Sequence, residues 1–214
     1  MISLRGFYAV LDRDDETLAR TLAAHACVLQ VRLKPRGSLA AAPASELVRV
    51  ARMARAVCTE HGIPLVVNDR IDIALTVGAD GVHLGQTDLP LADARAIAHG
   101  RVFIGISTHD LAQVRLAKAG GADYLGFGPV FATGTKANPD AVQGLSGLRS
   151  AVTCAAPLPV VAIGGINPGH ARDVYAAGAS CVCAIAAVNE APEVAVAARS
   201  LRMESSDIAR DSKL

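Results

Sequence analysis

The sequence is poor in aromatic residues and has almost no net charge. Tryptophan is absent, and aromatic residues make up only 3% of the 214 residues. Proteins that bind single-stranded nucleic acid stack the bases on aromatic side chains, which this chain largely lacks. Lys and Arg total 21 against 20 Asp and Glu, and a formal charge of +1 provides no broad basic face. Nucleic acid is therefore not an expected partner, and a binding site for an anion has to be built locally.

Cysteine pairs and long apolar segments are also missing. The cysteine count is odd, and the spacing contains no C-x-x-C pair and no Cys/His cluster typical of zinc, so we expect reduced, mostly buried thiols. They are Cys27, Cys58, Cys154, Cys181 and Cys183. No uncharged stretch reaches the length that spans a membrane, and the apolar run between Arg5 and Asp12 is too short for a signal sequence. We expect no membrane partner and a cytoplasmic location.

Short β-branched apolar runs alternate with Ala-rich amphipathic stretches along the chain, which is typical of repeated strand and helix units. We predict strands at residues 6–11, 28–33, 64–67, 81–84, 102–106, 123–127, 159–163 and 180–185. Helices are predicted at about 15–25, 44–61, 70–77, 90–98, 109–119, 143–153, 168–177 and 191–202. Eight units predict a single-domain (β/α)8 TIM barrel over residues 1–203, followed by a frayed polar tail at 204–214. The alternative, an open doubly wound sheet, lacks a G-x-G-x-x-G motif after the first strand.

A recurring Gly-Ala-Asp or Gly-Ala-Ser triplet stands where a helix should end and the next strand begin. It starts at Gly78, Gly121 and Gly178. Glycine tolerates the left-handed backbone that ends a helix. We interpret these triplets as turns on the stability face of the barrel, opposite the active site.

Active sites of such barrels lie at the carboxyl ends of the strands, so polar residues there carry functional weight. After the second strand, Gln30, Arg32 and Lys34 alternate with apolar residues and should share one face. They are candidate hydrogen-bond donors to an anionic ligand. The alternative is that Arg32 and Lys34 simply extend into solvent at the end of the strand.

Two carboxylates follow neighbouring strands. Asp69 comes after Asn68 at the end of the third strand, and Asp88 follows the fourth. Carboxylates in ones and twos, completed by phosphate and water, are how Mg2+ is normally held. Either Asp could instead be an ordinary helix cap. His83, within the fourth strand, is more consistent with a buried, hydrogen-bonded histidine than with a catalytic base.

The remaining strand ends also carry candidates. Ser107, Thr108 and His109 follow the fifth strand and could form only a helix cap, although the position faces the predicted active site. The loop after the sixth strand is rich in Gly and Pro and carries Thr133, Thr135 and Lys136, which can bind phosphate oxygens, unless the loop is simply a mobile surface segment. Barrels often bind phosphate after strands seven and eight, which would involve backbone N–H groups near Gly165 and Ala186.

These segments together resemble the thiamine phosphate synthase family across essentially the whole barrel. The resemblance rests on six motifs in order: Gln30-x-Arg32-x-Lys34, Asn68-Asp69-Arg70, Gly81 to Pro90 (GVHLGQTDLP), Gly105-x-Ser107-Thr108-His109, Gly126 to Lys136 (GFGPVFATGTK) and Ala162 to Ile166 (AIGGI). It implies a transferase of thiamine biosynthesis that joins 4-amino-5-hydroxymethyl-2-methylpyrimidine pyrophosphate to a thiazole phosphate. In the family's chemistry pyrophosphate leaves first to give a carbocation, which the thiazole nitrogen attacks.

The resemblance also implies roles for single residues. It implies that Asp69 and Asp88 hold Mg2+, and that Arg32, Lys34, Asn68 and Lys136 bind pyrophosphate. Gln30 and Ser107 would orient the pyrimidine, while Thr133, Thr135 and the backbone at Gly165, Ile185 and Ala186 would hold the thiazole phosphate. Arg32, Ser107 and Lys136 are the candidate catalytic groups.

The chain departs from the family pattern at two of these positions. The family commonly has Glu where this chain has Leu33, and Ser where it has Ala186. The second departure puts one phosphate contact in doubt, although backbone N–H groups remain there. Two other functions stay open: a thiazole tautomerase, which needs proton transfer and no pyrophosphate site, and a non-catalytic sensor of a phosphorylated ligand. A homo-oligomer is compatible with the sequence.

Overall fold

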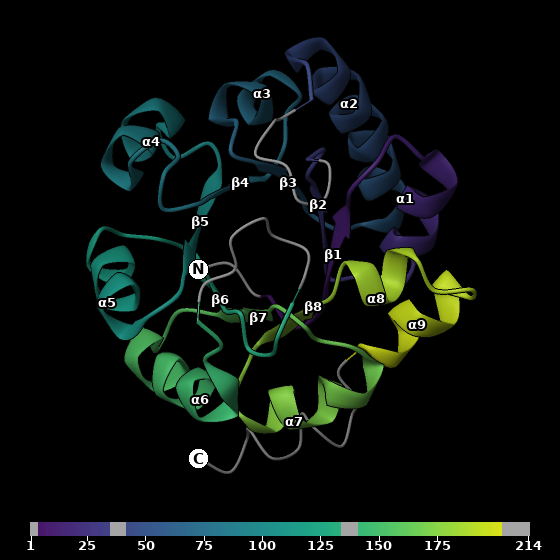
Figure 1. The fold of residues 1–214 in the computed structure, drawn as a ribbon. Helices are drawn as coiled ribbons and strands as arrows, with labels where there is room; N and C mark the ends of the chain where they lie inside the picture. Colours follow the sequence, from purple (N-terminus) through teal and green to yellow (C-terminus); the bar gives the residue numbers. More distant parts are fainter. Residues whose placement is uncertain (1–3, 35–41, 134–140, 203–214) are drawn as a thin grey trace.

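The chain folds into a closed barrel of eight parallel strands surrounded by helices (Figure 1). The computed structural model describes residues 4–34, 42–133 and 141–202. The strands are β1 (Gly6–Leu11), β2 (Val28–Val31), β3 (Leu65–Asn68), β4 (Gly81–Leu84), β5 (Phe103–Thr108), β6 (Tyr124–Phe127), β7 (Val160–Ile163) and β8 (Cys181–Cys183). Each strand pairs with the next, and β8 pairs with β1. The predicted TIM barrel is confirmed, and the doubly wound alternative is wrong.

Helices follow the strands and cover the outside of the barrel (Figure 1). Within the described ranges they are α1 (Glu16–Ala23), α2 (Ala44–His61), α3 (Ile71–Thr76), α4 (Leu91–Ala98), α5 (Leu111–Ala119), α6 (Gly144–Ala155), α7 (Ala171–Ala176), α8 (Ala186–Asn189) and α9 (Val194–Ser200). A short 3-10 turn, Pro168–His170, precedes α7. The helices thus close the outer layer that the sequence pattern predicted.

Alternating side chains of each strand divide the core into two parts. On β1, Phe7, Ala9 and Leu11 pack outward against the helices, while Tyr8 and Val10 point into the barrel. A strand has a side-chain period of two, so one face fills the barrel and the other supports the helices. Because the inward set includes tyrosine, the barrel interior is not wholly apolar.

The triplet glycines form turns at the ends of α3, α5 and α7, as predicted. Gly78, Gly121 and Gly178 all adopt positive φ, at 66°, 82° and 95°. After the first two, the aspartate carboxylates accept hydrogen bonds from the start of neighbouring strands: Asp80 from Leu65 N and Asp123 from Ile104 N, both at 2.7 Å. These residues therefore stabilise the amino-terminal face of the barrel.

Several predicted boundaries are wrong by a few residues. The second strand ends at Val31 rather than 33, and the eighth covers 181–183 rather than 180–185. The fifth strand continues to Thr108, and the segment predicted as one helix at 168–177 is a 3-10 turn followed by α7. The last predicted helix, 191–202, is α9 at Val194–Ser200, and the short α8 was not predicted.

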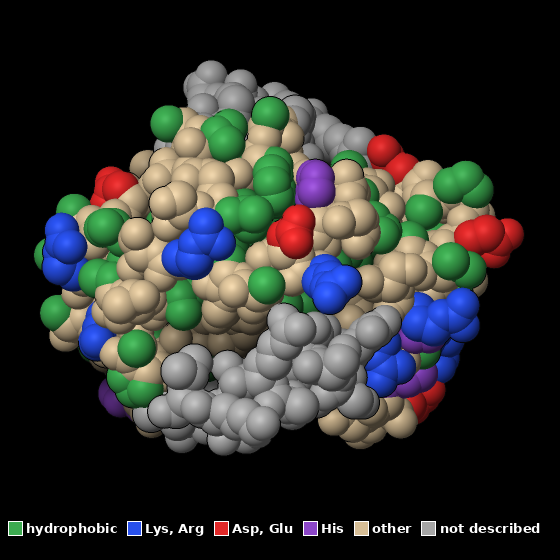
Figure 2. Space-filling view, turned by 90° about the horizontal axis from the view of Figure 1, so that it is seen from below, with side chains coloured by type: hydrophobic (Ala, Val, Ile, Leu, Met, Phe, Trp, Pro, Cys, Tyr) green, Lys and Arg blue, Asp and Glu red, His purple; other side chains and the backbone are tan. Residues whose placement is uncertain are grey.

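Charged side chains of both signs are scattered over the described surface seen in Figure 2, in keeping with the small net charge. Across the parts of the chain that the structure describes, no helix combines the length and the apolar character needed to cross a membrane. The predicted frayed tail at 204–214 lies outside the described residues.

Candidate active site

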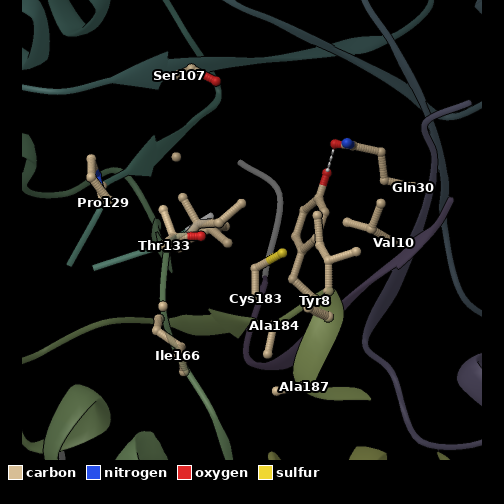
Figure 3. Close-up of a pocket in the computed structure, with 18 of the residues that line it drawn as sticks. Tyr8, Val10, Gln30, Ser107, Pro129, Thr133, Ile166, Cys183, Ala184 and Ala187 are labelled. Carbon is tan, nitrogen blue, oxygen red and sulfur yellow. Dashed lines mark hydrogen bonds between the residues drawn. The ribbon is translucent and has the colours of Figure 1, made fainter. Parts of the chain in front are cut away.

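A cavity of about 400 Å3 opens at the carboxyl ends of the strands. Its wall draws on seven of the eight strands or the segments that follow them, all except β3. Seven of the predicted site residues line it: Gln30, Arg32, Ser107, Thr133, Gly165, Ile185 and Ala186. In Figure 3, Gln30 and Ser107 point into the same space from different strands, and Thr133 lies between Ser107 and Ile166. The fold thus gathers residues that are more than 150 positions apart in sequence.

Gln30 is the predicted site residue that is most deeply fixed. It is inward-facing on β2 and only 5% exposed. Its carbonyl oxygen accepts a hydrogen bond from the hydroxyl of Tyr8 at 2.8 Å, which Figure 3 draws as a dashed line. Its amide nitrogen donates to Asn68 Oδ1 at 3.2 Å. A buried amide satisfied on both sides has one orientation, so Gln30 presents a fixed polar edge to the cavity.

Arg32 and Lys34 lie just beyond the end of β2, where the predicted strand continued. Leu33 between them is 8% exposed and belongs to the core beneath the helices. The two cations therefore lie on the same side of the chain although the segment is no longer a strand. Arg32 lies near Cys183 and lowers the pKa of its thiol. Burial has the larger effect and raises that pKa to about 12.

Lys34, Asp69 and Asp88 form an acidic cluster with one cation beside the cavity. Lys34 Nζ pairs with Asp69 Oδ2. The side chains of Asp69 and Asp88 interact directly with each other, and burial together with Asp88 raises the pKa of Asp69 despite the opposing effect of Lys34. Two adjacent carboxylates with one ammonium group leave an excess of negative charge, which favours a bound proton or cation. Asn68 connects this cluster to Gln30.

Neither aspartate is a helix cap, so that alternative is wrong. The residues that precede the first turns of α3 and α4 are Arg70 and Pro90. Asp69 has a left-handed φ of 62°, a conformation that Asp and Asn tolerate better than most residues. Asp88 Oδ2 accepts from Gly85 N at 2.7 Å, which fixes the loop after β4. Both carboxylates are held by loop geometry at the strand ends.

His83 and Ser107 belong to a chain of hydrogen bonds across the floor of the cavity. His83 Nε2 lies 2.9 Å from Ser107 Oγ, and His83 Nδ1 lies 2.9 Å from the hydroxyl of Tyr124. The Tyr124 hydroxyl lies 2.9 Å from that of Tyr8, which in turn donates to Gln30. The prediction that His83 is a hydrogen-bonded histidine is confirmed, although the side chain is only half-buried.

Ser107 and Thr108 do not form a helix cap. Both lie on β5, and the cap of α5 is Asp110, whose carboxylate accepts from Gln113 N at 2.8 Å. Thr108 is fully buried and donates to Gly126 O at 2.9 Å. His109 Nδ1 donates to Gly128 O at 2.6 Å and so anchors the segment after β6. All three residues line the cavity, but the Thr108 hydroxyl is committed to the backbone, so Ser107 is the hydroxyl of this segment that can serve a ligand.

The segment after β6 packs closely on the end of β7. Val130 N donates to Ile163 O and Phe131 N to Gly164 O, both at 2.9 Å. A Cβ on Gly165 would lie 2.3 Å from Ala132 O, so only glycine permits this approach. The predicted phosphate ligands Thr135 and Lys136 lie outside the described residues.

Ile185 and Ala186 line the cavity where β8 leads into α8. The first N–H groups of a helix have no partner within the helix, so backbone donors are available here without a serine side chain. The predicted backbone site for phosphate therefore has suitable groups at Gly165 and at Ala186.

Sequence reasoning missed Tyr8 and Tyr124 as parts of this site. They are 3% and 0% exposed. Both are polar side chains at inward-facing strand positions, and a buried tyrosine hydroxyl needs a partner. A tyrosine at an inward-facing position of a predicted strand was therefore the sequence signal that could have identified both residues.

The chain matches the model of a known family, described as thiamine monophosphate synthase, over residues 7–188. It is 46% identical over 179 residues to a thiamine-phosphate synthase of Methanospirillum hungatei, covering 84% of each chain. It is 45% identical over 187 residues to that of Moorella thermoacetica, covering 87% of this chain and 86% of the relative. A solved structure of thiamine phosphate pyrophosphorylase from Pyrococcus furiosus superposes with a TM-score of 0.83 at 34% identity, covering 97% of this chain and 96% of the other.

Proposed function

The chain belongs to the thiamine monophosphate synthase family, and we propose how its described residues carry out the transfer that this family performs. It is a transferase of thiamine biosynthesis, and its substrates are phosphorylated small molecules. The relatives bear the synthase name, and no feature of the described residues favours the tautomerase or the sensor. The reaction joins a pyrimidine pyrophosphate to a thiazole phosphate with release of pyrophosphate.

The observation that carries the proposal is the carboxylate pair of Asp69 and Asp88 beside a cavity whose described wall contains the cation Arg32 and no carboxylate. The pair interacts directly, and it is partly buried with Lys34 as its cation. Among the described residues no group of three or more His, Cys, Asp or Glu gathers as for a metal held by protein alone. Mg2+ fits this donor set because it is usually bound by one or two carboxylates together with substrate phosphates and water. When bound, Mg2+ neutralises charge on the departing pyrophosphate.

The remaining residues bind and orient the two substrates. Lys34, which pairs with Asp69, and Asn68, which precedes it, supply a cation and an amide to pyrophosphate oxygens, and Arg32 supplies a second cation from the cavity wall. Lys136, outside the described residues, is assigned a further cation by the family resemblance. Departure of pyrophosphate leaves positive charge on the pyrimidine methylene carbon, so stabilising the leaving group is the main catalytic demand. No protein nucleophile is needed.

The uncharged part of the cavity receives the two rings. Gln30 and Ser107 hold the edge of the pyrimidine, at opposite ends of the hydrogen-bond chain on the floor. Thr133 and Thr135, with the backbone N–H groups at Gly165, Ile185 and Ala186, hold the thiazole phosphate. A preorganised arrangement brings the thiazole nitrogen to the reacting carbon and replaces water there.

The proposal includes a cytoplasmic location. The free thiols of the described cysteines support this location.

An Mg2+ titration of pyrophosphate release tests the proposed metal site. Asp88→Asn should raise the Mg2+ concentration for half-maximal rate by about 10- to 100-fold or more, since even partners outside the first shell alter metal affinity by that amount. The matched control is Asp93→Asn, an exposed carboxylate in the first turn of α4. An unchanged titration in Asp88→Asn would remove this residue from the metal site.

A further inference from the structure

The hydrogen-bond chain on the cavity floor connects the two residues proposed to hold the pyrimidine. It runs from Gln30 through the hydroxyls of Tyr8 and Tyr124 and the ring of His83 to Ser107. Tyr8 and Tyr124 are buried, and their rings lie 6.0 Å apart between centroids. The mechanism proposed above uses only the two ends, which leaves the three residues in the middle to be explained.

Space for this chain is built into the barrel. A Cβ on Gly105 would lie 2.0 Å from the ring of Tyr124, and a Cβ on Gly126 would lie 3.2 Å from the ring of His83. Inward-facing glycines on β5 and β6 thus make room for one aromatic ring and one imidazole. Tyr124 and His83 thus occupy space that Gly105 and Gly126 leave open.

The donors along the chain follow from the orientation of Gln30. Its Nε2 donates to Asn68, so its carbonyl oxygen faces Tyr8, and Tyr8 donates to it. A phenol has one hydrogen, so Tyr8 must accept from Tyr124. Burial raises the pKa of both phenols, which keeps each hydrogen in place.

The same logic fixes the other end. The Tyr124 hydroxyl donates its only hydrogen to Tyr8, so it accepts a hydrogen bond from His83. Nδ1 of His83 therefore carries a hydrogen. In the neutral imidazole Nε2 is then an acceptor, and Ser107 donates its hydroxyl hydrogen to it. Ser107 is left with oxygen lone pairs toward the cavity. A reversed Gln30 amide would reverse every donor along the chain.

We infer that Tyr8, Tyr124 and His83 are positioning residues that make Ser107 a hydrogen-bond acceptor and Gln30 a donor toward the pyrimidine ring. A 4-aminopyrimidine offers an exocyclic N–H donor next to a ring-nitrogen acceptor, which complements this pair. The second Nε2 hydrogen of Gln30 is the one directed to the ring. The inference rests on the proposed function, because it takes the aminopyrimidine as ligand. The chain selects for the amino group without touching the reacting carbon.

The order of hydrogens can be measured without turnover. In protein labelled with 15N-histidine, the ring nitrogen shifts of His83, identified by comparison with His83→Gln, should show Nδ1 protonated and Nε2 unprotonated. Tyr124→Phe removes the acceptor for Nδ1, so the hydrogen should move toward Nε2. A wild-type His83 protonated at Nε2 alone would overturn the inference, since Ser107 would then be free to donate.

Substrate selection gives the second readout. Tyr8→Phe and Tyr124→Phe should each lower, by about 5- to 10-fold, the preference in kcat/KM for the aminopyrimidine pyrophosphate over its analogue with hydrogen in place of the amino group, as expected for one hydrogen bond. The KM for thiazole phosphate should not change. Tyr175→Phe is the matched control, because it loses a buried hydroxyl that donates to Leu201 O at 2.7 Å, away from the cavity.

The outcomes separate the inference from the proposed function. Unchanged preference in both tyrosine variants, or the same fall in Tyr175→Phe, would overturn the positioning role. Thermal denaturation of each variant shows whether the fold is kept, and Tyr8→Phe tests the chain independently if Tyr124→Phe does not fold. Wild-type protein that forms no thiamine phosphate would instead refute the proposed function, and the histidine shifts would still decide the order of hydrogens.

Discussion

Replacing Gly165 by alanine tests whether the end of β7 positions the segment after β6 that carries Thr133, a residue proposed to bind phosphate. Gly165 has a φ of +64°, and left-handed backbone costs an alanine about 1–2 kcal/mol. Its Cβ would also lie 2.3 Å from Ala132 O, where ordinary contact begins at 3.4 Å. The loop must therefore move by about 1 Å, which strains the hydrogen bonds from Val130 and Phe131, each worth about 1 kcal/mol.

The combined cost is about 2–4 kcal/mol, which in a domain of this size lowers Tm by roughly 5–15 °C. A misplacement of about 1 Å can cost about 100-fold in rate. We therefore expect kcat/KM for thiazole phosphate to fall by about 100-fold in Gly165→Ala, measured at a temperature where the variant is folded.

Gly78→Ala is the matched control for backbone strain. Gly78 has nearly the same φ, +66°, but a Cβ there meets no atom within 4 Å. It lies on the amino-terminal side of the barrel, so only its stability should fall, by about 1–2 kcal/mol. Equal kinetic constants in the two variants would refute the reasoning, because the clash with the loop would then have no catalytic consequence.

Three further substitutions test individual sites. Burial and Asp88 raise the pKa of Asp69 in the folded protein, so without metal the fold loses stability as pH rises from the ordinary Asp range through the raised pKa. In thermal denaturation with a chelator present, Asp69→Asn should flatten this loss. An unchanged slope of Tm against pH would contradict the prediction. Lys136→Ala should lower turnover by about 100-fold or more, and near wild-type turnover would refute its role. Ala186→Ser should lower the KM for thiazole phosphate by about 2- to 10-fold through one added hydrogen bond, and a KM that stays the same would separate this position from the phosphate.

The repeating pattern of the sequence predicted the barrel but not where each element stops. β2 ends at Val31, which pairs with Leu11, the last residue of β1. Strand length depends on neighbouring strands, which a local pattern does not contain. The short α8 consists of Ala186–Asn189, and no side-chain cap marks its start.

For the site, sequence order predicted which strand ends carry polar groups, and the structure brings most of them around one cavity. It did not predict their conformations or partners. Asp69 and Asp88 have the pattern of helix caps, yet the left-handed backbone of Asp69 directs its carboxylate toward Lys34 and Asp88. The Tyr8–Tyr124 contact joins residues 116 positions apart, which no local motif records. Long-range polar contacts inside the barrel were therefore the least predictable part.

The most direct test of the account is product formation by the purified protein. We would give it the pyrimidine pyrophosphate, the thiazole phosphate and Mg2+, follow pyrophosphate release, identify the organic product, and then omit each component in turn. The account predicts that thiamine phosphate forms with pyrophosphate in equal amounts and only when all three are present. Failure to form thiamine phosphate with all three present would contradict it.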